Sequence, residues 1–293
     1  MRLAASFAAL LGLTLGLLAA DARPALATAA AADTKAKINL SGRQRMLTQQ
    51  MAKAACFAAI AVQPAQHLAM LGKAHGLFER TLAGLREGDP DQGLEPESNI
   101  EVLVNLDQVT TLWGGFRSVN QEILGGGEAS EDQLQTIGRV NLPLLRQMHK
   151  TVGTIQKVYG STGSVHPALA LAINVSGRQR MLSQKASKEF CFVLAGIEPD
   201  ANRTALAATV ALFTESLEGL IAGDPAKALA PAPSEEIRAQ LEQVRALWQP
   251  LQDLMLRAAE GGTPSAEEIA AVASQNMPVL KAMNAAVQLY SRL

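Results

Sequence analysis

The sequence predicts an all-α protein made of two tandem four-helix up-down bundles that are related by an internal pseudo-two-fold axis. Three observations lead to this fold class. The chain repeats itself at a constant offset of 135 residues, and Pro and Gly divide each copy into four segments. Of the 293 residues, 48% are hydrophobic but only 4% are aromatic. That balance favours helices packed through small aliphatic side chains over a β-sandwich.

The repeat is clearest in a motif near the start of each copy. Residues 38–47 read Ile-Asn-Leu-Ser-Gly-Arg-Gln-Arg-Met-Leu, and residues 173–182 differ from them only by Val in place of the first Leu. The two cysteines and the two tryptophans of the chain also match at this offset, Cys56 with Cys191 and Trp113 with Trp248. A match without gaps predicts two copies of one domain.

Ahead of the first copy, residues 1–27 have the pattern of a secretory signal peptide. Arg2 precedes an apolar stretch of about a dozen residues or more, and Ala25-Leu26-Ala27 offers a cleavage site. The alternative is a transmembrane anchor, because the apolar stretch approaches the ~17 residues that a span needs. The small residues favour cleavage, so we expect a periplasmic protein that stays membrane-anchored if the signal is retained. No later segment is expected to cross a bilayer.

The first copy, residues 33–160, divides into four predicted helices, of about 35–62, 66–87, 98–125 and 130–159. Gly88-Asp89-Pro90 is a strong breaker after the second helix. Ser98, with Glu101 three residues later, predicts a capping box on the third helix. Ser130 is expected to cap the fourth helix, in which Pro143 should introduce a kink.

The second copy, residues 168–293, repeats this scheme, with Ser234 and Ser265 as expected caps on its third and fourth helices. A short linker rich in Gly, Ser and Thr, near residues 159–167, joins the copies. Four helices with short connections are typical of an up-down-up-down bundle. We expect an intrachain pseudo-dimer that is itself monomeric.

The first helix of each copy has two distinct faces. At 100° per residue, Leu40, Leu47 and Met51 cluster on one side, the usual core face of a bundle helix. The opposite face carries Ile38, Gly42, Arg45, Gln49 and Cys56, and in the second copy Ile173, Gly177, Arg180, Gln184 and Cys191. Because a solvated face would not ordinarily carry Ile, Gly and Cys, we expect it to meet its duplicate across the pseudo-two-fold axis.

Arg45 and Arg180 should then point at one another, with Gly42 and Gly177 permitting close approach of the two backbones. Two guanidiniums in a partly dry interface repel unless an anion lies between them, and the planar fork of Arg suits a carboxylate, phosphate or nitrate. Neither motif contains Asp or Glu, which favours an external anion. In the alternative, both arginines lie on the outer surface or pair with acids from neighbouring helices.

Cys56 and Cys191 lie on the same stripe as these arginines, about three turns further along. In an exported protein they could form a disulfide across the axis. The alternative is a pair of buried free thiols, a common state of cysteine. Arg43 and Arg178 fall on a different side of each helix and are expected to make contacts within their own domain or to face solvent.

The remaining motifs exclude several functions. The four histidines, His67, His75, His149 and His166, form none of the spacings that metal sites of helical bundles use. No nucleophile-and-base motif is present, so we predict neither an enzyme nor a cofactor. A formal charge of −1 argues against nucleic-acid binding. Trp113 and Trp248 are expected in the core, with a ligand-facing position as the alternative.

The segment Ile-Asn-Leu-Ser-Gly-Arg-Gln-Arg-Met-Leu-Thr-Gln at 38–49 resembles the opening helix of the PilJ-type domain, the N-terminal sensor module of type IV pilus methyl-accepting transducers. It is also similar to the signature helix in the periplasmic domain of NarX/NarQ-type nitrate/nitrite sensor kinases. The central Arg-Gln pair matches the PilJ type better. In the nitrate sensors, an anion binds between two signature helices, on the Arg before Met and the nearby Gly. Carried over by position, the resemblance implies that the anion-binding residues of this chain are Arg45 and Gly42 in the first copy and Arg180 and Gly177 in the second.

We therefore expect a periplasmic sensory protein that binds a small oxyanion, nitrate or nitrite first, between the two motif helices. The candidate ligand-binding residues are Gly42, Arg45, Gln49, Gly177, Arg180 and Gln184. A membrane sensor kinase or chemotaxis transducer is the candidate signalling partner. The alternative is a structural or interaction module that docks onto a pilus, chemotaxis or membrane sensor component.

Overall fold

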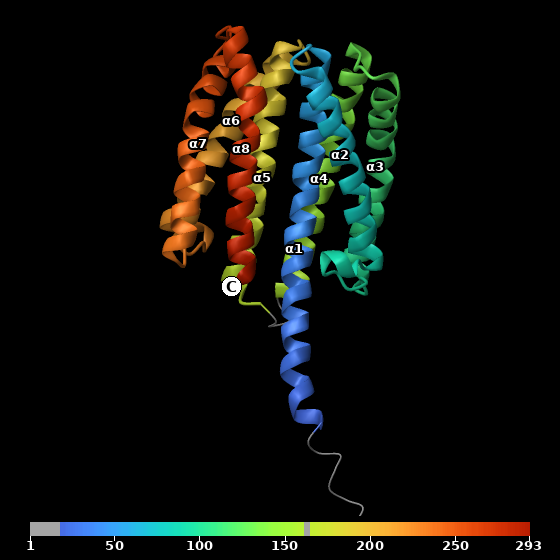
Figure 1. Cartoon of the computed structure of the whole chain (residues 1–293), viewed down its shortest axis with the longest axis vertical. Coiled ribbons are helices and arrows are strands. Elements are labelled where there is room, and N and C mark those ends of the chain that lie inside the picture. Colours follow the sequence, from blue (N-terminus) through green and yellow to red (C-terminus); the bar gives the residue numbers. More distant parts are fainter. Residues whose placement is uncertain (1–17, 161–164) are drawn as a thin grey trace, which may run out of the picture.

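The computed structural model describes residues 18–160 and 165–293. Over these two ranges the chain forms eight α-helices, arranged as two four-helix bundles side by side (Figure 1). The helices are α1 Leu18–Ala59, α2 Pro64–Glu87, α3 Ile100–Gly126, α4 Glu131–Gly160, α5 Pro167–Leu194, α6 Pro199–Ala222, α7 Glu235–Ala259 and α8 Ala266–Arg292, with 3-10 helices η1 Pro90–Gln92 and η2 Pro225–Lys227. The predicted fold class is confirmed.

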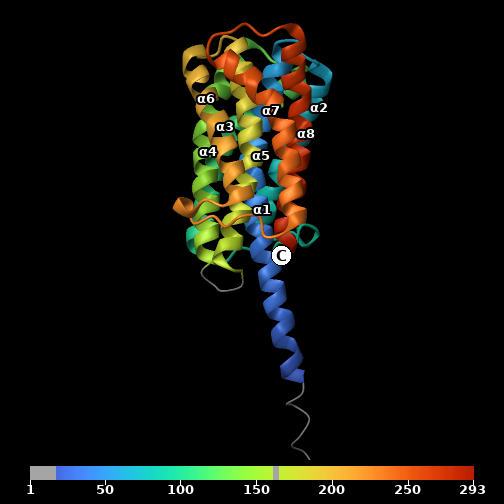
Figure 2. The same cartoon turned by 90° about the vertical axis from the view of Figure 1, so that its left-hand side faces the viewer.

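Helices α1 to α4 form bundle 1 and helices α5 to α8 form bundle 2, and successive helices run in opposite directions (Figure 1). The two bundles meet mainly through α1 and α5, which lie side by side in the middle of the molecule. Figure 2 shows the same pair from the side, between the outer helices. Because each faces its own bundle and its duplicate, the motif segments of α1 and α5 are buried on nearly every side.

The first helix begins earlier than predicted, at Leu18 rather than near Lys35, and its N-terminal part extends beyond the bundles (Figure 1). The segment before Lys35 is rich in Ala, the strongest helix former, so the helix extends through it. Of the predicted signal peptide, residues 1–17 lie outside the described residues.

The predicted cap of α3 is wrong by one residue. The side chain of Asn99 accepts the amide of Val102 at 3.1 Å, and Ser98 is not the cap. Its amide donates instead to the Glu97 carboxylate, which also accepts the Asn99 amide. The other three predicted serine caps are present: Ser130 on α4, Ser234 on α7 and Ser265 on α8. Ser265 also forms a full capping box with Glu268.

The repeated Gly-Asp-Pro turn has a steric cause. Gly88 has a φ of 86°, and a Cβ there would lie 2.9 Å from the ring of Pro96. Its equivalent Gly223 has a φ of 90° and faces Pro231 at 3.2 Å. Only glycine adopts this conformation without strain. The turn leads into η1 in bundle 1 and η2 in bundle 2, and these short helices end beside α1 and α5.

Both tryptophans lie in the cores of their bundles. Trp113 packs on Phe78 with a ring-centroid distance of 4.2 Å, and Trp248 stacks on Phe213 at 4.0 Å.

We expected no segment after the signal to be long and apolar enough to span a membrane, and by length and composition this expectation is wrong. Helix α6 is long and apolar enough to do so, but half of its apolar window is buried within the structure, as in a core helix of a bundle.

Candidate functional site

A disulfide fixes the two motif helices to each other. The sulfurs of Cys56 on α1 and Cys191 on α5 are 2.06 Å apart, and their Cα atoms are separated by 6.1 Å. Of the two states that the sequence left open for this pair, the structure has the bridge. The covalent link joins the bundles through the same stripe that carries the paired arginines.

The guanidiniums of Arg45 and Arg180 converge on the axis between α1 and α5. A Cβ placed on Gly42 would lie 3.4 Å from Nη2 of Arg45 and 3.7 Å from Nη2 of Arg180. At Gly177 the distances are 3.3 Å to Arg180 and 3.8 Å to Arg45. Both arginines are buried, with 0% and 2% of their surfaces exposed. The glycines thus leave the space that the two charged groups occupy, and neither arginine lies on the outer surface.

Asparagine oxygens of the opposite copy hold both guanidiniums. Nη2 of Arg45 donates to Oδ1 of Asn174 at 2.8 Å and to its carbonyl at 3.3 Å. Nη2 of Arg180 donates to Oδ1 of Asn39 at 2.8 Å and to its carbonyl at 3.0 Å. These asparagines are the second residue of each repeated motif, but they were not among the site residues predicted from the sequence. Among the described residues, neither guanidinium forms an ion pair with a carboxylate.

The outer contact of each guanidinium differs between the copies. Nη1 of Arg45 lies 3.3 Å from Nδ1 of His149, whereas Nη1 of Arg180 donates to Oδ1 of Asn284 at 2.9 Å. A guanidinium can only donate, so Nδ1 of His149 is an unprotonated acceptor. Partial burial, followed by the charges of Arg45 and Arg178, lowers the pKa of His149. The histidine is therefore neutral near pH 7.

The buried guanidiniums are electrostatically unfavourable as they stand. Burial first, and then the charges of Arg178 and Arg180, together lower the pKa of Arg45 to about 9. Burial also lowers the pKa of Arg180 to about 9, with a contribution from Arg43. Both groups still carry a proton at neutral pH, and their Nε atoms are buried without a hydrogen-bond partner. Because buried charges are normally paired, the arrangement is suited to an added anion.

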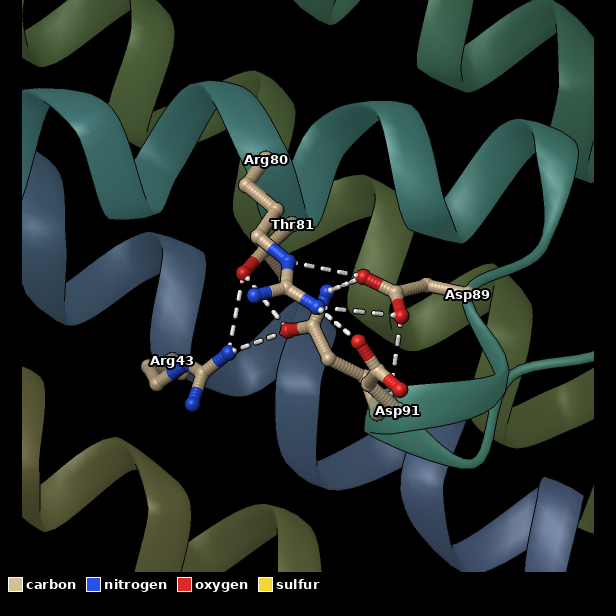
Figure 3. A network of polar contacts seen from close by, with 6 residues as sticks. Arg43, Arg80, Thr81, Asp89 and Asp91 are labelled. Atoms are coloured by element: carbon tan, nitrogen blue, oxygen red, sulfur yellow. Dashed lines mark hydrogen bonds and ion pairs between the residues drawn. The ribbon is translucent and has the colours of Figure 1, made fainter.

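Arg43 makes contacts within its own domain, one of the two positions expected for it. Its Nη2 donates to the Thr81 hydroxyl at 2.8 Å and to Oε1 of Gln92 at 2.7 Å (Figure 3). Figure 3 also shows Arg80 beside this group, paired with the carboxylates of Asp89 and Asp91.

The equivalent Arg178 of copy 2 has a weaker set of contacts. Its Nη2 lies 3.5 Å from the Ser216 hydroxyl, and its Nε is buried without a partner.

Gln49 and Gln184 are buried but their hydrogen bonds do not reach the guanidiniums. Gln49 donates to the Thr48 hydroxyl at 3.0 Å. Gln184 donates to the Ser183 hydroxyl and to Oδ1 of Asn276 on α8. The Oε1 atom of each glutamine has no hydrogen-bond partner. The two residues line the interface one turn beyond the arginines rather than completing the pair.

Two buried lysines match at the repeat offset and were not predicted from the sequence, Lys53 and Lys188. Nζ of Lys53 crosses from α1 to Asn276 of α8 and donates to its Oδ1 at 3.0 Å. Burial lowers the pKa of Lys53 to about 7 and that of Lys188 to about 8. Over residues 28–160 and 165–293, no three His, Cys, Asp or Glu side chains form a cluster that could hold a metal ion.

The chain matches a known family twice. The PilJ model, described as "Type IV pili methyl-accepting chemotaxis transducer N-term", matches residues 26–137 and residues 167–279. Each match covers most of one repeat and includes its motif segment, so the two halves of the site come from two copies of this domain. No curated protein matches the chain.

Proposed function

Because the chain belongs to the PilJ N-terminal domain family and carries that domain in two tandem copies, we propose that it is a sensory module that binds a small oxyanion on the axis between α1 and α5. Nitrate or nitrite is the first candidate. The protein acts without catalysis, in the periplasm, after export by residues 1–27. Its output passes to a membrane sensor kinase or a chemotaxis transducer.

One observation carries this proposal: two buried guanidiniums converge where no described carboxylate neutralises them. A monovalent anion about 4 Å from each charge gains roughly 4 kcal/mol per pair at an effective dielectric constant of 20. Part of that gain is offset by the loss of water from the anion. The remainder favours the occupied state, because it relieves the repulsion between Arg45 and Arg180.

The chemistry of the paired guanidiniums supports nitrate. The Cβ positions of Gly42 and Gly177 lie only 3.3–3.8 Å from the guanidinium nitrogens, so an anion held by both guanidiniums would lie against these two glycines. The three oxygens of nitrate can accept from two guanidinium forks at once. On binding, the anion takes over donors that now serve Asn39 and Asn174. The resemblance of the motif to the nitrate-sensor helix supports the same choice.

The disulfide supports a route for the signal. Cys56 lies about 16 Å beyond Arg45 along the helix, so the bridge fixes one end of the α1–α5 pair. A change in spacing at the arginines is therefore transmitted toward the N-terminal part of α1, which extends beyond the bundles (Figure 1).

Thermal unfolding with added nitrate, nitrite, chloride and sulfate tests the proposal at constant ionic strength. A ligand at 100 times its dissociation constant stabilises the folded state by about 2.7 kcal/mol. We expect nitrate to raise Tm of the wild type, and Arg45→Ala and Arg180→Ala to abolish the rise. Arg139→Ala is the control, because Arg139 is exposed on α4. Loss of the nitrate effect in the control variant as well would contradict a specific site.

A second function is favoured by the contacts of Asn39 and Asn174, which already accept from both guanidiniums at 2.8 Å. In that case the paired helices hold the two bundles together, and the outer surfaces dock onto a pilus or receptor component. If none of the four anions changes Tm of the wild type, this interaction function replaces the sensory one.

A further inference from the structure

A partly enclosed cavity of about 270 Å³ lies beside the paired arginines, among α4, α5, α6 and η2. Arg45 reaches it from α1, and Arg178 and Lys227 line it in bundle 2. Leu171, Val175 and Leu229 add an apolar wall. A wall of apolar side chains with a few convergent polar groups is typical of a small-molecule site.

The polar lining of the cavity has an excess of positive charge. Among the described residues that line the cavity, Asp224 is the only one with a carboxylate, and it pairs with Lys227 at 3.0 Å. Lys227 also pairs with the exposed Glu215. Neither Arg45 nor Arg178 forms an ion pair with a described carboxylate, although the charge of Glu215 acts on Arg178, and the Nε atom of each arginine is buried without a partner. The imidazole of His149 also lines the cavity beside the two arginines.

The corresponding place in bundle 1 is filled by a side chain. Gln92, at the position equivalent to Lys227, accepts from Arg43 at 2.7 Å and donates to Asp89 at 2.7 Å. Figure 3 shows this network between α1, α2 and η1. The amide nitrogen of Gln92 lies 3.2 Å from the Cβ position of Gly84.

In bundle 2 the lysine does not take this place. At the equivalent Gly219, the three nearest side-chain atoms belong to Asp224 and Leu229, and Lys227 is not among them. The side chain of Lys227 is engaged instead by Glu215 and Asp224. The exchange of Gln92 for Lys227, together with Thr81 for Ser216, accounts for a filled space in one copy and a cavity in the other.

We propose that this cavity binds a small organic monocarboxylate, with its carboxylate between Arg45 and Arg178 and its alkyl part against Leu171, Val175 and Leu229. At about 30 Å³ per water molecule, the cavity holds roughly nine waters, far more than a nitrate ion displaces. The site is thus separate in kind from the axial anion site, although Arg45 contributes to both. A more open hollow of about 430 Å³ shares His149 and Arg178 with it, which leaves room for longer acids.

Isothermal titration calorimetry of the full chain with acetate, propionate and butyrate tests this site, with propionamide as the uncharged control. We expect one carboxylate per chain, an affinity that rises about fourfold with each methylene, and no binding of propionamide. Arg178→Ala should weaken propionate at least tenfold. Arg43→Ala, the matched variant in the filled copy, should bind propionate as the wild type does.

Two designed variants exploit the repeat. Lys227→Gln with Ser216→Thr rebuilds the filled arrangement of bundle 1 and should remove propionate binding while Tm stays at or above that of the wild type. Gln92→Lys with Thr81→Ser should open the equivalent space and raise the stoichiometry toward two. The proposal is overturned if no acid binds the wild type, or if the rebuilt variant binds propionate normally.

A third variant separates this site from the axial one. Loss of propionate binding in Arg180→Ala would also overturn the proposal, because it would place the acid on the axis. If the wild type binds nitrate but not propionate, the carboxylate site in the cavity is refuted and the axial anion site is not. Propionate binding without any nitrate effect refutes the axial site alone.

Discussion

Gly42→Ala should make the protein more stable and at the same time remove its response to nitrate. The added methyl lies 3.4 Å from Nη2 of Arg45 and 3.7 Å from Nη2 of Arg180, which are ordinary van der Waals distances. The substitution therefore causes no clash, and replacing Gly by Ala inside a helix gains about 1 kcal/mol. For a chain of this size we expect Tm to rise by about 2 °C. The methyl occupies the space that the anion needs.

Differential scanning calorimetry with and without nitrate measures both effects. Gly153→Ala is the matched control, because Gly153 lies inside α4, is exposed, and has no neighbour within 4 Å of its Cβ position. The control should gain similar stability and keep the nitrate-induced rise in Tm. A Gly42→Ala variant that responds to nitrate as the wild type does would show that the anion does not lie between the two guanidiniums.

Three further predictions concern stability. Replacing Cys56 and Cys191 by Ala should lower the free energy of unfolding in urea by about 5 kcal/mol, because the bridge spans 135 residues; an unchanged midpoint would contradict this. Burial, followed by the charge of Lys53, lowers the pKa of His67 to about 4, so the unfolded state binds the extra proton and this residue should cost up to about 3 kcal/mol of stability from pH 6.5 to 4; His67→Phe should reduce the slope, and the part that remains includes His149, whose pKa burial also lowers. Burial lowers the pKa of Lys53 to about 7, so between pH 7 and 10 the unfolded state keeps a proton that the folded state has lost, and stability should rise with pH over this range; the rise should be smaller in Lys53→Met, with the remainder due to Lys188, whose pKa burial lowers to about 8.

The repeat made much of the fold predictable from sequence. A gapless offset predicts two equal domains, and the face of the motif helix that carries Gly42, Arg45 and Cys56 predicts which helices meet. The structure places α1 against α5 on that face. Periodicity is informative here because each motif helix is buried on both sides, so both stripes had to be compatible with an interior.

The hydrogen-bond partners could not be predicted in the same way. A helical wheel gives the direction of a side chain but not the acceptor that it meets on another helix, so Asn39 and Asn174 were missed. Asn99 rather than Ser98 caps α3 because the Glu97 carboxylate accepts the amides of both Ser98 and Asn99. A capping pattern does not include this competition from a neighbouring side chain.

The cavity in bundle 2 was also hidden from sequence. The exchange of Gln92 for Lys227 is one polar residue for another in an exposed loop. Its effect depends on whether the side chain turns inward to Arg43 or outward to Glu215, and only coordinates show which partner is within reach.

Anomalous diffraction from crystals grown in bromide tests the axial anion site most directly, because bromide is a monovalent anion whose position can be located without assumptions about the protein. We expect a bromide peak between Nη2 of Arg45 and Nη2 of Arg180 that disappears when nitrate is added. A map without a peak on this axis, in which Asn39 and Asn174 alone still hold the two guanidiniums, would contradict an anion sensor built on the paired motif helices.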